Sequence, residues 1–191
     1  MGLMINFDEA SHTYTVDGMA VPSVTTILGV FDRGLERVPR EVLDEKAALG
    51  KAVHRACEYH DLGTLDESTV HPMVLPYLEQ WLRFRAEVRF DIEANERVLF
   101  NALHGYIGTA DRIIRLESAR SVLDIKTGMQ RPWHALQTAG YAAAAEKYDP
   151  EPVTRRFSLH LTPTTYRLIE HRERNDRPTF MGAVALYHWL K

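Results

Sequence analysis

Two apolar, strand-like runs joined by a short turn constrain this chain most, because each of them carries an acidic residue. The runs are GYIGTADRIIRL and SVLDIKTG. A charge in a half-buried strand is unfavourable unless a partner compensates it. If the runs pair as antiparallel strands about a turn centred on Glu117 and Ser118, Asp111 lies directly opposite Asp124. The group that neutralises the charges of these two acids therefore indicates what the site does.

The second run adds a lysine to the two acids. Alternation along a strand places Asp124 and Lys126 on one face, with Leu123 and Ile125 on the other. Two like charges at cross-strand distance repel each other, and Mg²⁺, which takes one or two carboxylates and keeps several waters, relieves that repulsion. Lys126 is then placed to orient or deprotonate an attacking water, or to stabilise charge on a phosphate. A solvated cluster of cross-strand salt bridges is the alternative interpretation.

Hydrophobic periodicity predicts one α/β domain, in which helices flank a mixed central β-sheet. An N-terminal β-hairpin is expected about Asp17-Gly18, a strong hairpin signal. Ser23 stands near a helix start, and Pro72 is expected to begin a later helix. The expected helices cover 40–60, 72–88, 132–148 and 180–191, and the expected strands cover 96–102, 105–116, 121–128, 155–162 and 166–173.

The chain of 191 residues is interpreted as a single domain, 1–191, because no Gly/Ser/Pro-rich linker divides it. Within it we expect a hairpin leader at 1–30, a catalytic core at 40–150, and C-terminal strands and a helix at 151–191. Cys57 is the only cysteine, which excludes internal disulfides and favours a reducing cytoplasm. No apolar run approaches the roughly 20 residues that span a bilayer, so no membrane partner is expected.

Charge distribution leaves a polyanionic partner open. The formal net charge is −3, which neither requires nor forbids nucleic acid. Arginine occurs in short groups, one of them formed by Arg112, Arg115 and Arg120. We interpret these groups as solvated surface, with local basic grooves as the alternative.

Several motifs together resemble a known family. GTADRI, VLDIKTG and HALQTAGY, in that order, are similar to the G-x-x-D, D-x-K-T and Q-x-x-x-Y motifs of the PD-(D/E)xK nuclease superfamily, in its RecB-like and phage-exonuclease branch. The upstream G-x-x-x-H helix of that branch is matched by GKAVH, with Glu58 four residues after His54. The opening YTVDGMAVPSVTTIL is similar to the leader of many phage-encoded members.

The resemblance implies a restriction-endonuclease-like core and assigns roles by position. Its implied metal ligands are His54, Asp111, Asp124 and the carbonyl of Ile125. Lys126 becomes the catalytic lysine, while Gln137 and Tyr141 position the substrate or that lysine. For Glu58, the roles of metal ligand, partner of His54 and simple ion pair stay open.

Other polar and aromatic residues receive less specific interpretations. His134 falls on the same helical stripe as the Gln/Tyr motif and is a weaker site residue. Glu96 can supply a further carboxylate, but we interpret it as a charge at a strand end. Trp81 and Trp133 are interpreted as core residues rather than as platforms for base stacking.

The function expected from these residues and the resemblance is a deoxyribonuclease that uses Mg²⁺ or Mn²⁺ to hydrolyse phosphodiester bonds. The resemblance implies an exonuclease acting on DNA ends in recombination or repair, encoded by a phage or prophage, working beside a single-strand annealing protein and able to form homo-oligomers. We expect the protein to hold no iron–sulfur cluster, because a single cysteine cannot bind one. The alternatives are a non-catalytic nucleic-acid-binding or assembly module and a metal phosphohydrolase for small nucleotides.

Overall fold

The turn between the two acidic runs forms as the sequence predicts. In the computed structural model, β5 (Tyr106–Leu116) and β6 (Ala119–Lys126) are antiparallel, and the pairing of Ile113 with Val122 has the predicted register. Glu117 and Ser118 have φ values of 50° and 66°. Positive φ at both central residues is the geometry of a type I′ hairpin turn, whose twist matches that of the strands.

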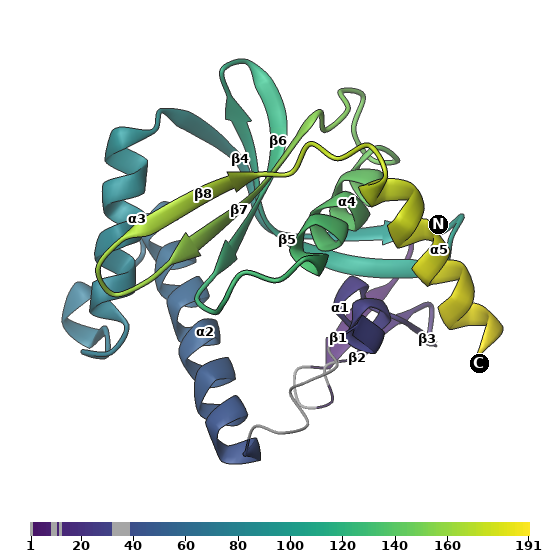
Figure 1. Ribbon diagram of the computed structural model, residues 1–191, viewed down its shortest axis with the longest axis horizontal. Helices are drawn as coiled ribbons and strands as arrows, with labels where there is room; N and C mark the ends of the chain where they lie inside the picture. The colour runs from purple at the N-terminus through teal and green to yellow at the C-terminus, as the bar shows by residue number, and fades with distance from the viewer. Residues whose placement is uncertain (1, 9–10, 12, 32–38) are drawn as a thin grey trace.

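Five strands form the main sheet, in the order β4-β5-β6-β7-β8 (Figure 1). The added strands are β4 (Phe90–Asn101), β7 (Arg155–Leu161) and β8 (Tyr166–Glu170). Neighbours are antiparallel except β6 and β7, which are parallel. Parallel neighbours require a crossover, and α4 (Trp133–Ala145) lies in that connection. The predicted mixed α/β sheet is confirmed.

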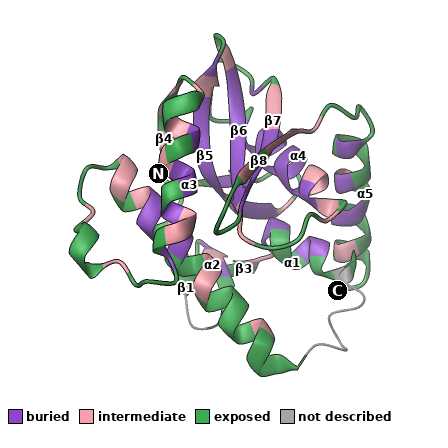
Figure 2. Ribbon diagram, turned by 60° about the vertical axis from the view of Figure 1, so that its left-hand side comes forward, coloured by how far each residue is buried: buried purple, intermediate pink, exposed green. Residues whose placement is uncertain are grey.

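Helices cover both faces of the sheet, so the strands are buried between two apolar clusters (Figure 2). On one face, α4 packs with α1 (Val24–Leu28) and α5 (Asp176–Trp189). On the other, α2 (Arg40–Asp61) and α3 (Leu75–Glu87) cover the sheet. The N-terminal half of α2 extends away from the body of the molecule (Figure 1).

A separate antiparallel sheet of three strands lies near the N-terminus, in the order β1-β2-β3. Its strands are β1 (Ile5–Asp8), β2 (Thr13–Val16) and β3 (Met19–Val21). The predicted hairpin about Asp17 and Gly18 is confirmed, with φ values of 49° and 81°. Strand β1, which pairs with β2, was not predicted from the sequence.

The N-terminal sheet joins the main sheet through side chains and backbone. Tyr14 and Val16 pack against Phe100 and Ile107, and the backbone N–H of Ile107 donates to the Pro22 carbonyl at 3.0 Å. Strand β2 therefore lies against the part of β5 that leads into the acidic residues.

The structure describes residues 2–8, 11, 13–31 and 39–191. Residues 1, 9–10 and 12 of the expected leader lie outside these ranges. Within the described ranges, no helix is both long enough and apolar enough to cross a membrane.

Three elements begin three or more residues away from where the sequence predicts. Helix α3 begins at Leu75 rather than at Pro72, and it is Pro76 that occupies the first turn, where the missing N–H of a proline has no helical partner to lose. Strand β4 begins at Phe90, because FDIEAN alternates apolar and polar residues as a strand does. Helix α5 begins four residues early, at Asp176.

Candidate metal centre and active site

The two aspartates lie where β5 and β6 stop pairing with each other. The last antiparallel pair joins Arg112 to Leu123, so Asp111 and Asp124 follow one step beyond the ladder. From there β6 continues beside β7. The Asp111 carboxylate instead accepts the backbone N–H of Ile125 at 2.6 Å. The strands thus diverge at the aspartates, whose carboxylates both line a cavity of about 460 Å³.

Asp124 and Lys126 share a face of β6, as alternation predicts. The Lys126 Nζ lies 2.7 Å from an Asp124 carboxylate oxygen. Leu123 and Ile125 point the other way, into the core beneath α2 and α3. Asp124 is 1% exposed, so Lys126 supplies the compensating charge that a buried carboxylate requires.

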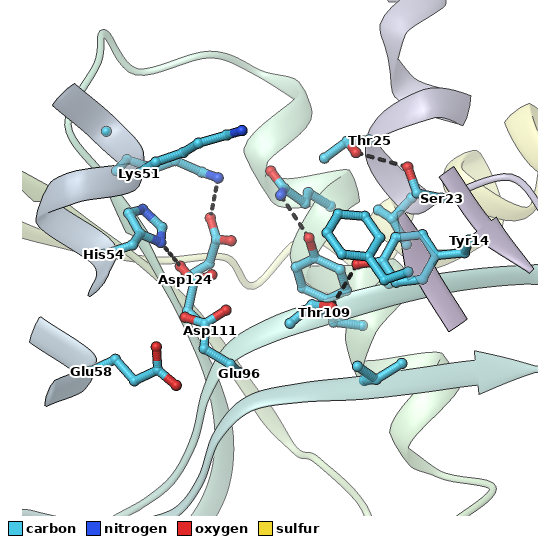
Figure 3. A pocket seen from close by; sticks show the side chains of 18 of the residues that line it. Tyr14, Ser23, Thr25, Lys51, His54, Glu58, Glu96, Thr109, Asp111 and Asp124 are labelled. Carbon is cyan, nitrogen blue, oxygen red and sulfur yellow. Dashed lines mark hydrogen bonds and ion pairs between the residues drawn. The ribbon is translucent and has the colours of Figure 1, made fainter. Parts of the chain in front are cut away.

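A second group of potential ligands surrounds Asp111. Ligand atoms of His54, Glu96 and Asp111 lie within 4.8 Å of one another. His54 comes from α2, and its Nδ1 is 3.5 Å from Asp111 Oδ2. Figure 3 shows His54, Asp111 and Asp124 meeting in the pocket, with Glu96 and Glu58 beside them. Side chains from helix α2 and from the paired strands β4 and β5 therefore converge on one point.

Glu96 lies at a different place in its strand from the one that the sequence predicts. It is not a strand-end charge, because it lies in the interior of β4. The pairs Asn95 with Arg112 and Arg97 with Ala110 flank it, which places it beside Asp111. Its φ of 43° is left-handed, an uncommon conformation for a residue other than glycine. The alternating FDIEAN run before it was the signal that could have placed it inside the strand.

The other residues implied by the resemblance lie around the same cavity. Glu58 lines it without joining the three-residue ligand group. Gln137 and Tyr141 line it from α4, and the Gln137 amide donates to the Tyr141 hydroxyl at 2.8 Å. A Cβ at Gly108 would lie 2.6 Å from Cε1 of Tyr141. Gly108 therefore lets the Tyr141 ring pack directly on β5.

Burial and mutual repulsion set the protonation of the acids. Burial, reinforced by the Asp111 charge, raises the pKa of Glu96 to about 7. Burial also raises the pKa of Asp124 to about 6, with Lys126 opposing and Asp111 adding to the rise. Burial disfavours the Asp111 charge as well, but the nearby His54 and Lys126 outweigh it and lower the pKa of Asp111. A divalent cation among these carboxylates would favour the ionised form of all three.

Arg112 is a buried structural element behind the site, contrary to the expectation of solvated surface. Its side chain is fully buried. Its Nε donates to Asp61 at 2.9 Å, and its Nη1 donates to the Asp111 carbonyl at 2.6 Å and lies 3.4 Å from a Glu96 carboxylate oxygen. The Trp81 ring lies beneath the guanidinium, 5.5 Å away. Arg112 thus ties the end of α2 to the strands that carry two of the acids.

Three sequence candidates lie outside the pocket. His134 is buried on α4, with its ring 5.3 Å from that of His160. Trp81 is 0% exposed and packs against Phe84, which confirms its interpretation as a core residue. Trp133 is half-buried, with the Arg131 guanidinium 5.4 Å from its ring.

Three histidines packed near β7 each contribute acid sensitivity to the stability of the folded protein. Burial, with repulsion from Lys126 and His160, lowers the pKa of His134 to about 3, and burial also lowers the pKa of His160 and His171. Below about pH 6.5 the unfolded chain therefore binds a proton at His134, whereas the folded protein binds it only near pH 3. We therefore expect His134 alone to lower the free energy of unfolding by about 1 kcal/mol per pH unit as pH drops below about 6.5, a contribution that the raised pKa values of Glu96 and Asp124 oppose.

Urea unfolding followed by circular dichroism at a series of pH values measures this slope. Relative to the unaltered protein, His134→Gln should gain stability as the pH drops below about 6.5. An identical slope in both proteins would contradict a neutral, buried His134.

The model of a family described as the PD-(D/E)XK nuclease superfamily matches residues 26–181. No curated protein matches the sequence. Among solved structures, the chain is similar to one described as the crystal structure of SSO0001, with 19% identity, coverage of 88% of this chain and 84% of that chain, and a TM-score of 0.40. The family match includes α2, β4, β5, β6 and α4, the elements that carry the candidate ligands and their neighbours.

Proposed function

The chain belongs to the PD-(D/E)XK nuclease superfamily, and we propose that it is a deoxyribonuclease that hydrolyses DNA phosphodiester bonds with Mg²⁺ or Mn²⁺, acting as an exonuclease on DNA ends. Membership of this superfamily supports the assignment of the chain as a metal-dependent nuclease. The single observation that carries the proposal is the convergence, in one cavity, of the His54, Glu96 and Asp111 group with the Asp124–Lys126 pair.

The donor set fits a divalent cation of this kind. Carboxylate oxygens predominate, as Mg²⁺ and Mn²⁺ prefer, and a neutral imidazole is a common ligand of divalent metals. We assign Asp111, Glu96 and Asp124 as carboxylate ligands and His54 as the nitrogen ligand. A divalent ion bound there supplies Lewis acidity to a phosphate oxygen and lowers the pKa of an attacking water.

Lys126 is assigned the role of orienting the attacking water or stabilising charge on the phosphate. Its ammonium group is held 2.7 Å from Asp124, and its side chain is 20% exposed, so it can meet a substrate at the cavity surface. Pre-positioned charge of this kind contributes most where water is excluded. The Tyr141 hydroxyl accepts the Gln137 amide proton, which leaves its own O–H free to donate toward a substrate oxygen.

The size of the cavity favours a strand end as the substrate. Cavities of roughly 300–1,000 Å³ enclose ligands of small-molecule size, and this one measures about 460 Å³. A volume of this order suits one or two nucleotides of a single strand better than an intact duplex. A strand end reaches such a cavity without the cost of unstacking a nucleotide in the middle of a duplex.

Digestion of end-labelled linear DNA and of circular DNA of the same sequence tests this function. We expect loss of linear DNA from its ends with added Mg²⁺ or Mn²⁺, protection of the circle, and no reaction in EDTA. Cleavage of the circle would establish an endonuclease instead. Hydrolysis of nucleotides alone would indicate a small-molecule phosphohydrolase, and DNA binding without cleavage would indicate a non-catalytic module.

The resemblance extends the proposal to biological context. It favours a phage or prophage enzyme that acts in DNA recombination or repair in the cytoplasm, beside a single-strand annealing protein and as a homo-oligomer. Light scattering of the purified protein measures the oligomeric state. Co-purification with an annealing protein encoded beside the gene tests the partner.

A further inference from the structure

Lys51 lies on the wall of the pocket that α2 forms. It stands three residues before His54, so the two side chains share a helix face, and both line the cavity (Figure 3). The neighbouring Gly50 brings α2 close to the end of β6, because a Cβ at Gly50 would lie 3.2 Å from the Thr127 hydroxyl. The contact between Gly50 and Thr127 therefore places the Lys51 backbone near the strand end that carries Lys126.

The charges around the cavity do not by themselves suit a polyanion. The charged side chains that line it are Lys51, Arg55, Glu58, Glu96, Asp111, Asp124 and Lys126. Four of these are carboxylates, which repel a phosphate backbone. Bound metal offsets part of that charge, and Lys126 is already paired with Asp124.

The charge of Lys51, by contrast, is available to a ligand. Within the part of the chain that the structure describes, no carboxylate forms an ion pair with Lys51. Its side chain is exposed, so its ammonium group can meet a phosphate without first giving up a partner or being desolvated.

We propose that Lys51 binds a backbone phosphate of the DNA strand next to the bond that is cleaved, and so positions that strand in the cavity. This inference rests on the proposed function. Lysine offers a compact point charge with three donors, and phosphate contacts orient a nucleic acid without reading its sequence. Lys51 therefore contributes to affinity for any DNA sequence and leaves the chemical step to the buried residues.

Binding of fluorescent single-stranded oligonucleotides, with phosphorothioate linkages that resist cleavage, tests this role in Mg²⁺ at several salt concentrations. For Lys51→Ala we expect binding about 10-fold weaker for oligonucleotides of different sequence. The slope of log K against log salt should become less negative by about 0.7, the value for one lost contact to a single strand. Lys51→Arg should retain most of the affinity.

Lys46→Ala is the matched control, because Lys46 is an exposed lysine on the same helix that does not line the cavity. It should bind as the unaltered protein does. In cleavage assays Lys51→Ala should raise KM and leave kcat within about twofold. Unchanged affinity and salt slope in Lys51→Ala, or equal losses in Lys46→Ala, would overturn the proposal. Absence of cleavage by the unaltered protein would refute the proposed function alone, because the binding slope is measured without turnover.

Discussion

Replacing Asp124 with alanine is expected to lower DNA cleavage by about 10³-fold or more while the protein stays folded. Loss of a charge-stabilising or proton-transferring group in an active site costs on the order of 10²–10⁴ in rate. Asp124 is 1% exposed and directly contacts Lys126, so its removal deprives the site of both a carboxylate ligand and the group that holds the lysine. Cleavage of end-labelled linear DNA measures the loss.

Lys126→Ala is expected to abolish cleavage to a similar extent by a different route. Lys126 is assigned no metal-binding role, so this variant should bind Mn²⁺ as the unaltered protein does, whereas Asp124→Ala should bind it more weakly. Isothermal titration calorimetry with Mn²⁺ separates the two effects. Asp124→Asn, which preserves side-chain volume, guards against a loss caused by a cavity.

Matched surface substitutions control for nonspecific effects of charge removal. Asp91 on β4 and Lys147 after α4 are exposed, and Asp91→Ala and Lys147→Ala should cleave DNA normally. Cleavage at the unaltered rate by either Asp124→Ala or Lys126→Ala would remove the basis for assigning the active site to this cavity.

The largest effect on stability is expected from Arg112→Met. Its guanidinium is fully buried against Asp61, whose carboxylate is also 0% exposed. Removing one partner of a buried ion pair costs about 3–5 kcal/mol, and Asp61 would keep only the Trp81 indole donor at 3.1 Å and the Arg85 guanidinium at 3.9 Å. The substitution also removes the donor to the Asp111 carbonyl and the charge beside Glu96. We therefore expect a large drop in the free energy of unfolding, measured by urea denaturation.

Arg177→Met provides the comparison. Arg177 forms a bidentate pair with Glu146, but the two side chains are 54% and 36% exposed. Exposed ion pairs contribute about 0–1 kcal/mol, so this variant should unfold at nearly the same urea concentration as the unaltered protein. Similar losses in the two variants would show that burial does not set the contribution of Arg112.

Much of the central hairpin could be read from sequence because its determinants are local. The period of two along a strand decides that Asp124 and Lys126 share a face, and the turn at Glu117-Ser118 decides the register of β5 against β6. Both expectations are confirmed by the pairing of the strands and by the contact between Asp124 and Lys126. The helix containing His54 was equally evident from its sequence.

The surroundings of Glu96 and Arg112 were harder to predict from the sequence, because they depend on elements elsewhere in the chain. Glu96 enters the site only because β4 extends back to Phe90 and pairs with β5 along its length. Arg112 is buried only because α3 places Trp81 beneath it and α2 ends at Asp61. No local pattern distinguishes such an arginine from a solvated one.

Strand period and turn geometry act over a few neighbouring residues, so local sequence specifies the α/β class, the register of the central hairpin and the shared face of Asp124 and Lys126. No local pattern, by contrast, predicts that ligand atoms of His54, Glu96 and Asp111 lie within 4.8 Å of one another. Their meeting depends on how one helix and two strands pack, and that packing is set by apolar burial summed over the whole domain rather than by any single segment.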